Sequence, residues 1–109
     1  MAPLIRGTIH WCELGDNPET GEAGFSRPVL IVSSTQTPLG APVVIIPVTT
    51  TERNYPTDIP LGDTLKRPSY LQCQQIRAIS RARVREPIAT VDAAIMAKVG
   101  VILRRILEI

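Results

Sequence analysis

Arg27 stands at the start of a short apolar segment, where a charged side chain is well placed to do chemistry. Pro28 follows it, and the apolar run 29–32 ends in two serines. A proline moves the preceding residue toward extended geometry, so Arg27 should enter a strand. A guanidinium keeps its proton at neutral pH and can donate to two oxygens of an anion. Arg27 is therefore a candidate functional residue, although an arginine at a strand end is often a solvated charge or half of an ion pair.

Basic residues gather in one part of the chain. The segment 64–85 contains no acid and six basic side chains, Lys66, Arg67, Arg77, Arg81, Arg83 and Arg85, whereas the net charge of the whole chain is only +2. Segment 13–22 has four acids and no base. A local excess of positive charge is what a polyanion partner requires, and solvated protein faces show it as well.

The cysteines and the histidine have no spacing typical of a metal or redox site. Cys12 and Cys73 are far apart in the chain, and His10 is the single histidine. We therefore expect reduced structural thiols, no metal and no cofactor. A pair of histidines acting as acid and base is excluded.

The length and composition of the chain are those of a single globular domain spanning residues 1–109. The hydrophobic fraction is 44% and the charged fraction is 20%. No apolar run approaches the roughly 20 residues that a membrane span needs, and residues 1–11 lack the apolar core of a secretion signal. We expect a cytoplasmic protein with no membrane association.

Short strands separated by turns should position Arg27. Composition and alternation predict strands at 8–14, 29–32, 43–51, 58–61, 69–77 and 84–89. A glycine-rich loop over 15–26 leads directly into Arg27 and suits a lid. In the first strand we expect Trp11 in the core and His10 as a satisfied polar group on the other face. Pro47 cannot donate to a sheet and should mark an edge or a bulge.

One helix is predicted over 91–108, with Thr90 as its N-cap. Ile95, Val99, Ile102 and Ile106 form an apolar stripe that indicates a largely packed helix. The stripe also exceeds what a small sheet can cover. Gly100 within the helix indicates close contact with a neighbour.

Strands followed by a terminal helix predict a mainly β protein with α, a small half-open barrel covered by that helix. Arg27 begins its strand and Thr49 ends the next one. Antiparallel neighbours would place both side chains at one rim of the barrel.

Five segments in order resemble the MazF/PemK toxins of bacterial toxin–antitoxin modules. They are the segments 6–11, 21–24, 27–33, 46–50 and 75–79, and a helix follows them. The resemblance covers most of the chain. It implies an SH3-like barrel of the CcdB/MazF type that forms a homodimer and cuts single-stranded RNA at short sequences without a metal.

The same resemblance implies a toxin of a type II module, an mRNA interferase that inhibits translation and growth. Its reaction is attack of a ribose 2′-hydroxyl on the adjacent phosphate, which leaves a 2′,3′-cyclic phosphate and a 5′-hydroxyl. Its partner would be an antitoxin whose acidic, disordered tail folds on binding and uses the basic segment.

The family's catalytic arginine maps onto Arg27, and its strand-end threonine maps onto Thr49. Arg27 would stabilise the charge of the phosphorane, and the Thr49 hydroxyl would donate to a phosphate oxygen. Glu22 is the nearest carboxylate able to act as base if the loop folds over the site, and it can equally be a solvated loop acid. We assign RNA binding to Arg53, Asn54, Gln75, Arg77, Arg81 and Arg83.

Two departures from the family pattern bear on activity. Gly21 stands where the family often has serine or histidine, and Gln74 stands where it usually has an acid. Either change could lower activity or alter the RNA sequence that is cut. Two alternatives remain open: a gyrase-poisoning toxin of the similar CcdB type, although the chain lacks the Trp-Gly ending, and a non-catalytic binding protein of the same fold.

Overall fold

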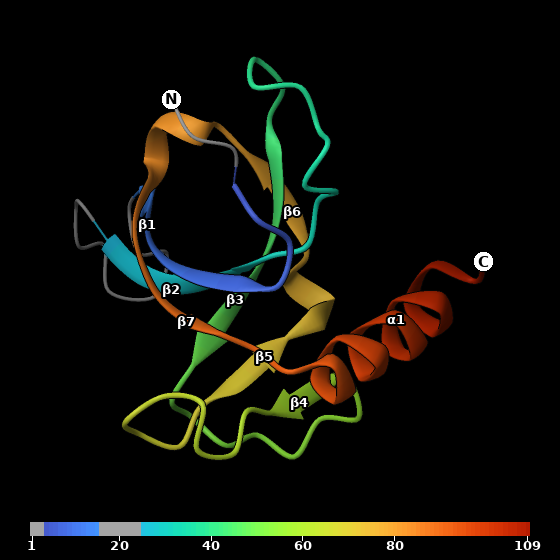
Figure 1. The fold of residues 1–109 in the computed structure, drawn as a ribbon. Helices are drawn as coiled ribbons and strands as arrows, with labels where there is room; N and C mark the ends of the chain where they lie inside the picture. The colour runs from blue at the N-terminus through green and yellow to red at the C-terminus, as the bar shows by residue number, and fades with distance from the viewer. Residues whose placement is uncertain (1–3, 16–24) are drawn as a thin grey trace.

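In a computed structural model of the chain, residues 4–15 and 25–109 are described, and they form a curved antiparallel sheet with one C-terminal helix (Figure 1). The strands are β1 (Thr8–Gly15), β2 (Phe25–Ile31), β3 (Val43–Thr49), β4 (Asp58–Pro60), β5 (Tyr70–Gln72), β6 (Arg77–Ile79) and β7 (Val84–Thr90), and the helix is α1 (Ala93–Leu107). Two short 3-10 turns, η1 (Cys73–Gln75) and η2 (Arg81–Arg83), interrupt the strands. The predicted mainly β, half-open architecture is confirmed.

The strand order is β4-β5-β3-β2-β1-β7, and β6 also pairs with β3. β3 therefore has two partners on one edge. Its first residues pair with β6, from Val43 opposite Ile79, and its last residue Thr49 lies opposite Tyr70 of β5. Because the two partners diverge from one strand, the sheet curls without closing, as Figure 1 shows.

The interpretation of 69–77 as one strand running into a turn is right for β5 and the turn, but it misses β6, which begins at Arg77. β5 pairs with the end of β3. The chain then turns through η1 and pairs with the start of β3 as β6, so the segment 69–77 is divided between two strands. A hydrogen bond from the Ile76 amide to the Cys73 carbonyl closes the turn. Pro47 lies between the parts of β3 that pair with β5 and β6, where a missing amide donor leaves no ladder bond unmade.

Alternating side chains of β2 and β3 fill two apolar clusters. Leu30 and Ile46 belong to the cluster that also contains Val99 of α1. Val29, Ile31 and Ile45 belong to the other cluster, inside the curve of the sheet. Because successive strand residues point to opposite faces, both faces of β2 and β3 are buried and the strands form a rigid support.

The first strand differs from its prediction at Trp11. This side chain is 38% exposed, because it alternates with buried Cys12 and shares its face with exposed Glu13. His10 is buried and satisfied as predicted: its ring nitrogens lie 2.8 Å from the Arg85 carbonyl and 3.1 Å from the Thr8 hydroxyl. The cysteines are buried free thiols, as expected.

The helix begins two residues later than predicted. Its N-cap is Asp92, whose Oδ1 accepts from the Ile95 amide at 2.8 Å. Thr90 is the last residue of β7 and pairs with Thr8, so it cannot cap the helix. The close contact predicted at Gly100 is also wrong, since a Cβ there would meet nothing within 4 Å.

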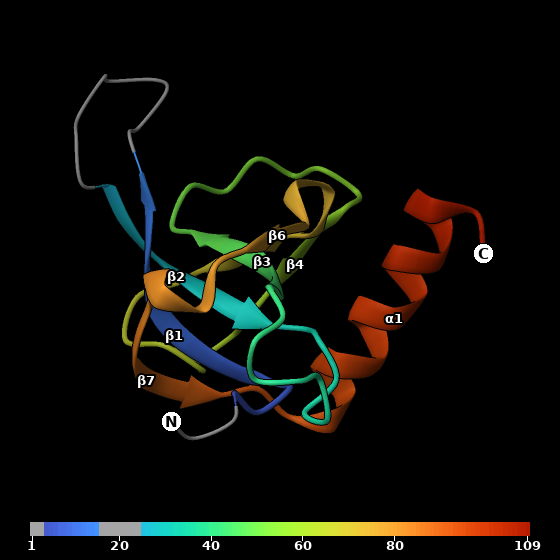
Figure 2. The same cartoon turned by 90° about the horizontal axis from the view of Figure 1, so that it is seen from above.

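α1 lies beside one end of the sheet rather than across it (Figure 2). Val99 is its one fully buried side chain, and Val101 and Leu107 are about half exposed. The four predicted stripe residues are buried or half-buried against the core, so the helix is packed along its stripe as predicted and exposed outside it. No helix in the described residues is long and apolar enough to cross a membrane.

Candidate active site

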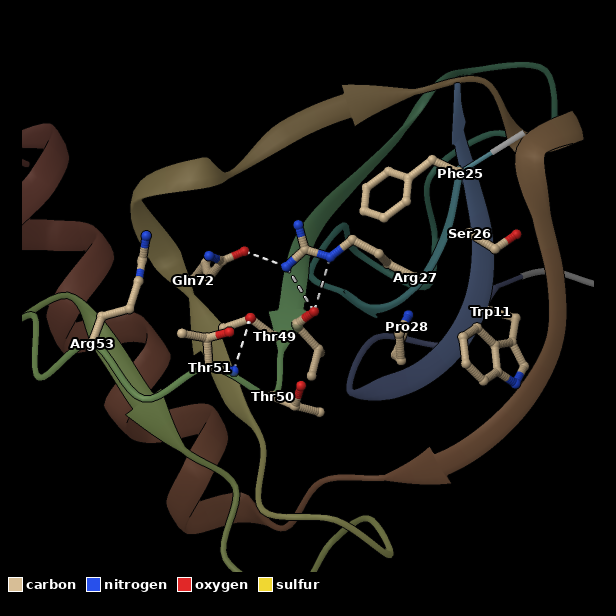
Figure 3. A pocket seen from close by; sticks show the side chains of 11 residues that line it. Trp11, Phe25, Ser26, Arg27, Pro28, Thr49, Thr50, Thr51, Arg53 and Gln72 are labelled. Atoms are coloured by element: carbon tan, nitrogen blue, oxygen red, sulfur yellow. Dashed lines mark hydrogen bonds between the residues drawn. The ribbon is translucent and has the colours of Figure 1, made fainter. Parts of the chain in front are cut away.

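The ends of β2 and β3 border an open cavity of about 490 Å³ (Figure 3). β2 supplies Arg27 and Pro28 to its wall, and β3 supplies Val48 and Thr49. The remaining lining residues come from β1, the start of β2, the segment after β3, and β5: Trp11, Phe25, Ser26, Thr50, Thr51, Arg53 and Gln72. The cavity is rich in hydroxyl and guanidinium groups, which suits a polar, anionic ligand.

The guanidinium of Arg27 is held by partners on two other strands. Its Nε and Nη2 donate to the Val48 carbonyl at 3.1 and 2.8 Å, and Nη2 also donates to Oε1 of Gln72. The Phe25 ring lies 5.6 Å from the guanidinium carbon. These contacts fix the plane of the guanidinium, so its orientation toward the cavity is set before any ligand binds.

Thr49 lies at the same rim as Arg27, as predicted. Val29 pairs with Pro47, so continuing the antiparallel register places Arg27 beside Thr49. The Thr49 hydroxyl accepts from the Thr51 amide at 3.1 Å. A hydroxyl that accepts one bond still has its own proton to donate, so Thr49 can offer a hydrogen bond to an anion in the cavity.

Gln72 is the site residue that the sequence interpretation missed. It comes from β5 and is only 8% exposed, yet its side chain reaches the cavity and Arg27. One signal was available: Gln72 is an amide between two buried apolar residues, Leu71 and Cys73. A polar group in such a run needs a partner, and the partner is Arg27.

Arg53 is the one predicted RNA-binding residue that lines this cavity. Its Nε and Nη2 donate to the two carboxylate oxygens of Asp58 at 2.9 and 2.7 Å, and its guanidinium lies 4.2 Å from the Tyr55 ring centre. The hydrogen bond with Asp58 raises the pKa of Arg53 above its usual value. Asn54 is exposed in a left-handed conformation and does not line the cavity.

The basic segment 64–85 does not form one surface. Lys66 and Arg67 lie in the loop between β4 and β5, at the end of the molecule opposite η2 in Figure 1. Arg81 donates to the carbonyls of residues 37, 38 and 41 and so serves the structure. The other basic side chains are exposed on or near β6 and β7, and none lines the cavity around Arg27.

These basic residues also differ in whether their side chains have a protein partner. Arg83 donates to the Glu13 carbonyl at 3.4 Å, and Arg85 forms an ion pair with the Glu13 carboxylate at 2.8 Å. Arg77 and Gln75 are exposed on β6 and η1, away from the cavity lining. The structure therefore brings together Arg27, Thr49 and Arg53 and leaves the other predicted RNA contacts apart from them.

Glu22, the candidate base, and Gly21 lie outside the described residues. Gln74, the other departure from the family pattern, is exposed in η1 and does not line the cavity. Within residues 4–15 and 25–109, no group of three or more His, Cys, Asp or Glu side chains is arranged to hold a metal ion.

Comparison with known proteins identifies one matching family. Residues 5–107 match the model of the PemK-like, MazF-like toxin of type II toxin–antitoxin systems. None of the curated proteins matches the chain by sequence.

Solved structures of similar fold match along nearly the whole chain. An endoribonuclease in complex with its cognate antitoxin, from a mycobacterial species, is 26% identical over 97% of this chain and 96% of its own, with a TM-score of 0.77. A mycobacterial endoribonuclease is 26% identical over 100% and 95%, with a TM-score of 0.78. MazF from Deinococcus radiodurans is 24% identical over 98% of each chain, with a TM-score of 0.81, and at that identity it supports the fold alone.

Proposed function

Because the chain belongs to the PemK-like, MazF-like toxin family of type II toxin–antitoxin systems, we propose that it is a ribonuclease that cuts single-stranded RNA and thereby arrests translation and growth. The observation that carries the proposal is the Arg27 guanidinium, fixed by Val48 and Gln72 beside the Thr49 hydroxyl in an open cavity. Similar structures described as endoribonucleases support the same activity.

In the proposed reaction the ribose 2′-oxygen attacks the adjacent phosphorus while the bond from phosphorus to the 5′-oxygen breaks. The 2′-hydroxyl proton passes to a base, and the departing 5′-oxygen gains a proton. The products are a 2′,3′-cyclic phosphate and a 5′-hydroxyl. Negative charge accumulates on the phosphorane oxygens, and donors already aimed at that charge lower the barrier most.

We assign the charge stabilisation to Arg27. Its guanidinium keeps its proton at neutral pH, so it suits an electrostatic role better than proton transfer. Thr49 donates to a second phosphate oxygen. Glu22 is our candidate for the base, on the sequence argument alone.

We assign the RNA contact nearest the cut to Arg53, which lines the same cavity as Arg27. Exposed Arg77, Arg83, Asn54 and Gln75 would contact the strand farther from the cut. The protein would act as a homodimer with a groove formed by both chains, and a cognate antitoxin would silence it by placing an acidic segment on the exposed arginines. The antitoxin complex among the similar structures supports such a partner.

The proposal is tested by incubating the purified protein with a long RNA in EDTA and mapping the new ends. We expect cuts at a short recurring sequence, with 5′-hydroxyl ends that a kinase labels directly. Products with 5′-phosphates, or cleavage that requires added Mg²⁺, would contradict the proposed mechanism. Intact RNA under every condition would favour a non-catalytic binding protein.

A further inference from the structure

A second cavity, of about 550 Å³, is lined by Trp11 but not by Arg27. Trp11, Pro28 and Thr50 line both cavities, so the two spaces adjoin along this edge. Figure 3 shows the indole of Trp11 beside Pro28 and at a distance from Arg27. The wall farther from Arg27 includes Ile88 of β7 and the loop residues Lys66 and Arg67.

The indole of Trp11 is unusually available for a ligand. It is 38% exposed, and Ile88 in the same cavity is also 38% exposed. In the described part of the chain its N–H makes no hydrogen bond. A large aromatic ring left open beside a strand costs apolar burial, and it offers a flat surface on which a nucleobase can stack.

Lys66 and Arg67 differ from four arginines of the chain in having no side-chain partner among the described residues. In the described residues the side chains of Arg53, Arg81, Arg83 and Arg85 have protein partners, whereas those of Lys66 and Arg67 have no hydrogen bond or ion pair. Both are exposed beside the second cavity. Their charge is therefore available to an external anion.

We propose that the second cavity binds the nucleotide next to the one whose phosphate lies at Arg27, with its base against Trp11 and its phosphate between Lys66 and Arg67. This inference rests on the proposed ribonuclease function and extends its site. Aromatic stacking combined with a basic rim is the usual means of holding single-stranded nucleic acid. A continuous edge through Pro28 and Thr50 lets one strand contact both cavities.

Trp11 is the chain's single tryptophan and lines both cavities, so its fluorescence reports a ligand in either of them. The probes are 2′-O-methyl RNA oligonucleotides, which lack the attacking hydroxyl and stay intact. A pentanucleotide should quench the fluorescence strongly and a dinucleotide weakly, because a dinucleotide has a single phosphate and cannot place one at Arg27 and another between Lys66 and Arg67. Trp11→Ala should weaken pentanucleotide binding by about 5- to 30-fold, as judged by the anisotropy of a labelled strand. Trp11→Phe keeps a stacking ring and should retain most of the affinity.

The charged half of the inference is tested by salt dependence. Replacing both Lys66 and Arg67 with alanine should reduce the slope of log affinity against log salt by about 0.7, the value for one phosphate of a single strand that is no longer neutralised. Lys98→Ala is the matched control, because Lys98 is an exposed lysine on α1 that lines neither cavity. Its slope should equal that of the unchanged protein.

The possible results distinguish failure of the second-cavity proposal from failure of the proposed ribonuclease function. If the protein cuts RNA but the pentanucleotide leaves Trp11 fluorescence and Trp11→Ala affinity unchanged, the second cavity is not a nucleotide site and the ribonuclease proposal stands. If the protein neither cuts RNA nor binds the pentanucleotide, both fail. Quenching by an acidic peptide and not by RNA would assign the cavity to a protein partner and overturn the inference.

Discussion

Gln72 contacts Arg27 across an intervening strand. Nη2 of Arg27 donates to Oε1 of Gln72, although β2 and β5 are separated in the sheet by β3. The same nitrogen donates to the Val48 carbonyl of β3, so three strands hold one guanidinium. The catalytic candidate is thus positioned by the sheet itself.

Gln72→Leu tests this positioning, because it keeps the size of the side chain and removes the acceptor. A hydrogen bond to a charged group contributes about 1.5–3 kcal/mol, so we expect RNA cleavage to slow by roughly 10- to 100-fold. The loss should fall on kcat, with KM nearly unchanged, because Arg27 acts on the charge of the transition state. Gln36→Leu, at an exposed position that lines neither cavity, is the control and should cut normally. Equal kcat for both variants would remove Gln72 from the site.

Arg27→Ala should lower the cleavage rate by about 10²- to 10³-fold, which corresponds to about 2.7–4 kcal/mol of lost transition-state stabilisation. Arg27→Lys is the informative companion, since it keeps the charge but not the planar fork, and it should recover only part of the rate. Circular dichroism should match the unchanged protein in both cases. A fully active Arg27→Ala variant would refute the assignment.

Thr49→Val keeps the shape of the side chain and removes the hydroxyl, so cleavage should slow if that hydroxyl donates to phosphate. The change also removes the acceptor of the Thr51 amide, and the thermal midpoint must therefore be measured alongside the rate. A slow enzyme of unchanged stability supports the phosphate contact. An unchanged rate leaves Thr49 with a structural role only.

Much of this site follows from local sequence rules. Pro28 fixes extended geometry at Arg27, and the apolar runs within 29–32 and 43–51 predict two buried strands whose ends near Arg27 and Thr49 share one rim. Gln72 and Trp11 could not be placed in this way. Their environments depend on where β5 and β1 lie in the sheet, and that arrangement is set by long-range pairing rather than by neighbouring residues.

The surroundings of the helix also could not be predicted from local sequence. Its periodic stripe predicts the packed side of the helix correctly but does not show that the apolar Val101 and Leu107, outside the stripe, stay about half exposed. Their exposure depends on where β7 ends beside the sheet. Thr90 and Asp92 are both acceptable caps by composition, and the pairing of Thr90 with Thr8 decides between them.

Burial and the nearby Asp58 carboxylate raise the pKa of the Cys73 thiol to about 11, against 9.0 for an exposed thiol. Below pH 9 the thiol is protonated in both the folded and the unfolded chain. Between these pKa values the unfolded chain loses the proton and the folded chain keeps it, so the free energy of unfolding should fall as pH rises, by up to about 1.4 kcal/mol per pH unit. Urea titrations from pH 8 to 11 measure this slope.

Cys73→Ala is the control for that slope. It removes the titrating group and should flatten the pH dependence relative to the unchanged protein, while the smaller side chain lowers stability at every pH. Identical slopes for the two proteins would show that Cys73 does not titrate as its burial requires.

The basic residues after β6 should separate into structural and RNA-binding groups. Arg81 donates to the carbonyls of Ala41, Pro38 and Thr37 at 3.0, 3.3 and 3.4 Å. Arg81→Ala removes this donor from all three carbonyls, and of them the Pro38 carbonyl still accepts from the Ala41 amide. We expect a loss of about 1–3 kcal/mol in the free energy of unfolding. The salt dependence of RNA binding should hardly change, because this charge is already engaged by the protein.

Arg77→Ala is the matched comparison, since Arg77 is exposed on β6 and its removal uncovers no carbonyl in the described residues. Surface substitutions of this kind usually change stability by less than about 0.5 kcal/mol. If Arg77 contacts a phosphate, its loss should reduce the slope of log affinity against log salt by about 0.7. Thermal unfolding and a salt titration of oligonucleotide binding, run on both variants, measure the two effects separately. A reduced salt slope for Arg81→Ala, with unchanged stability, would return Arg81 to the RNA-binding group in which the sequence first placed it.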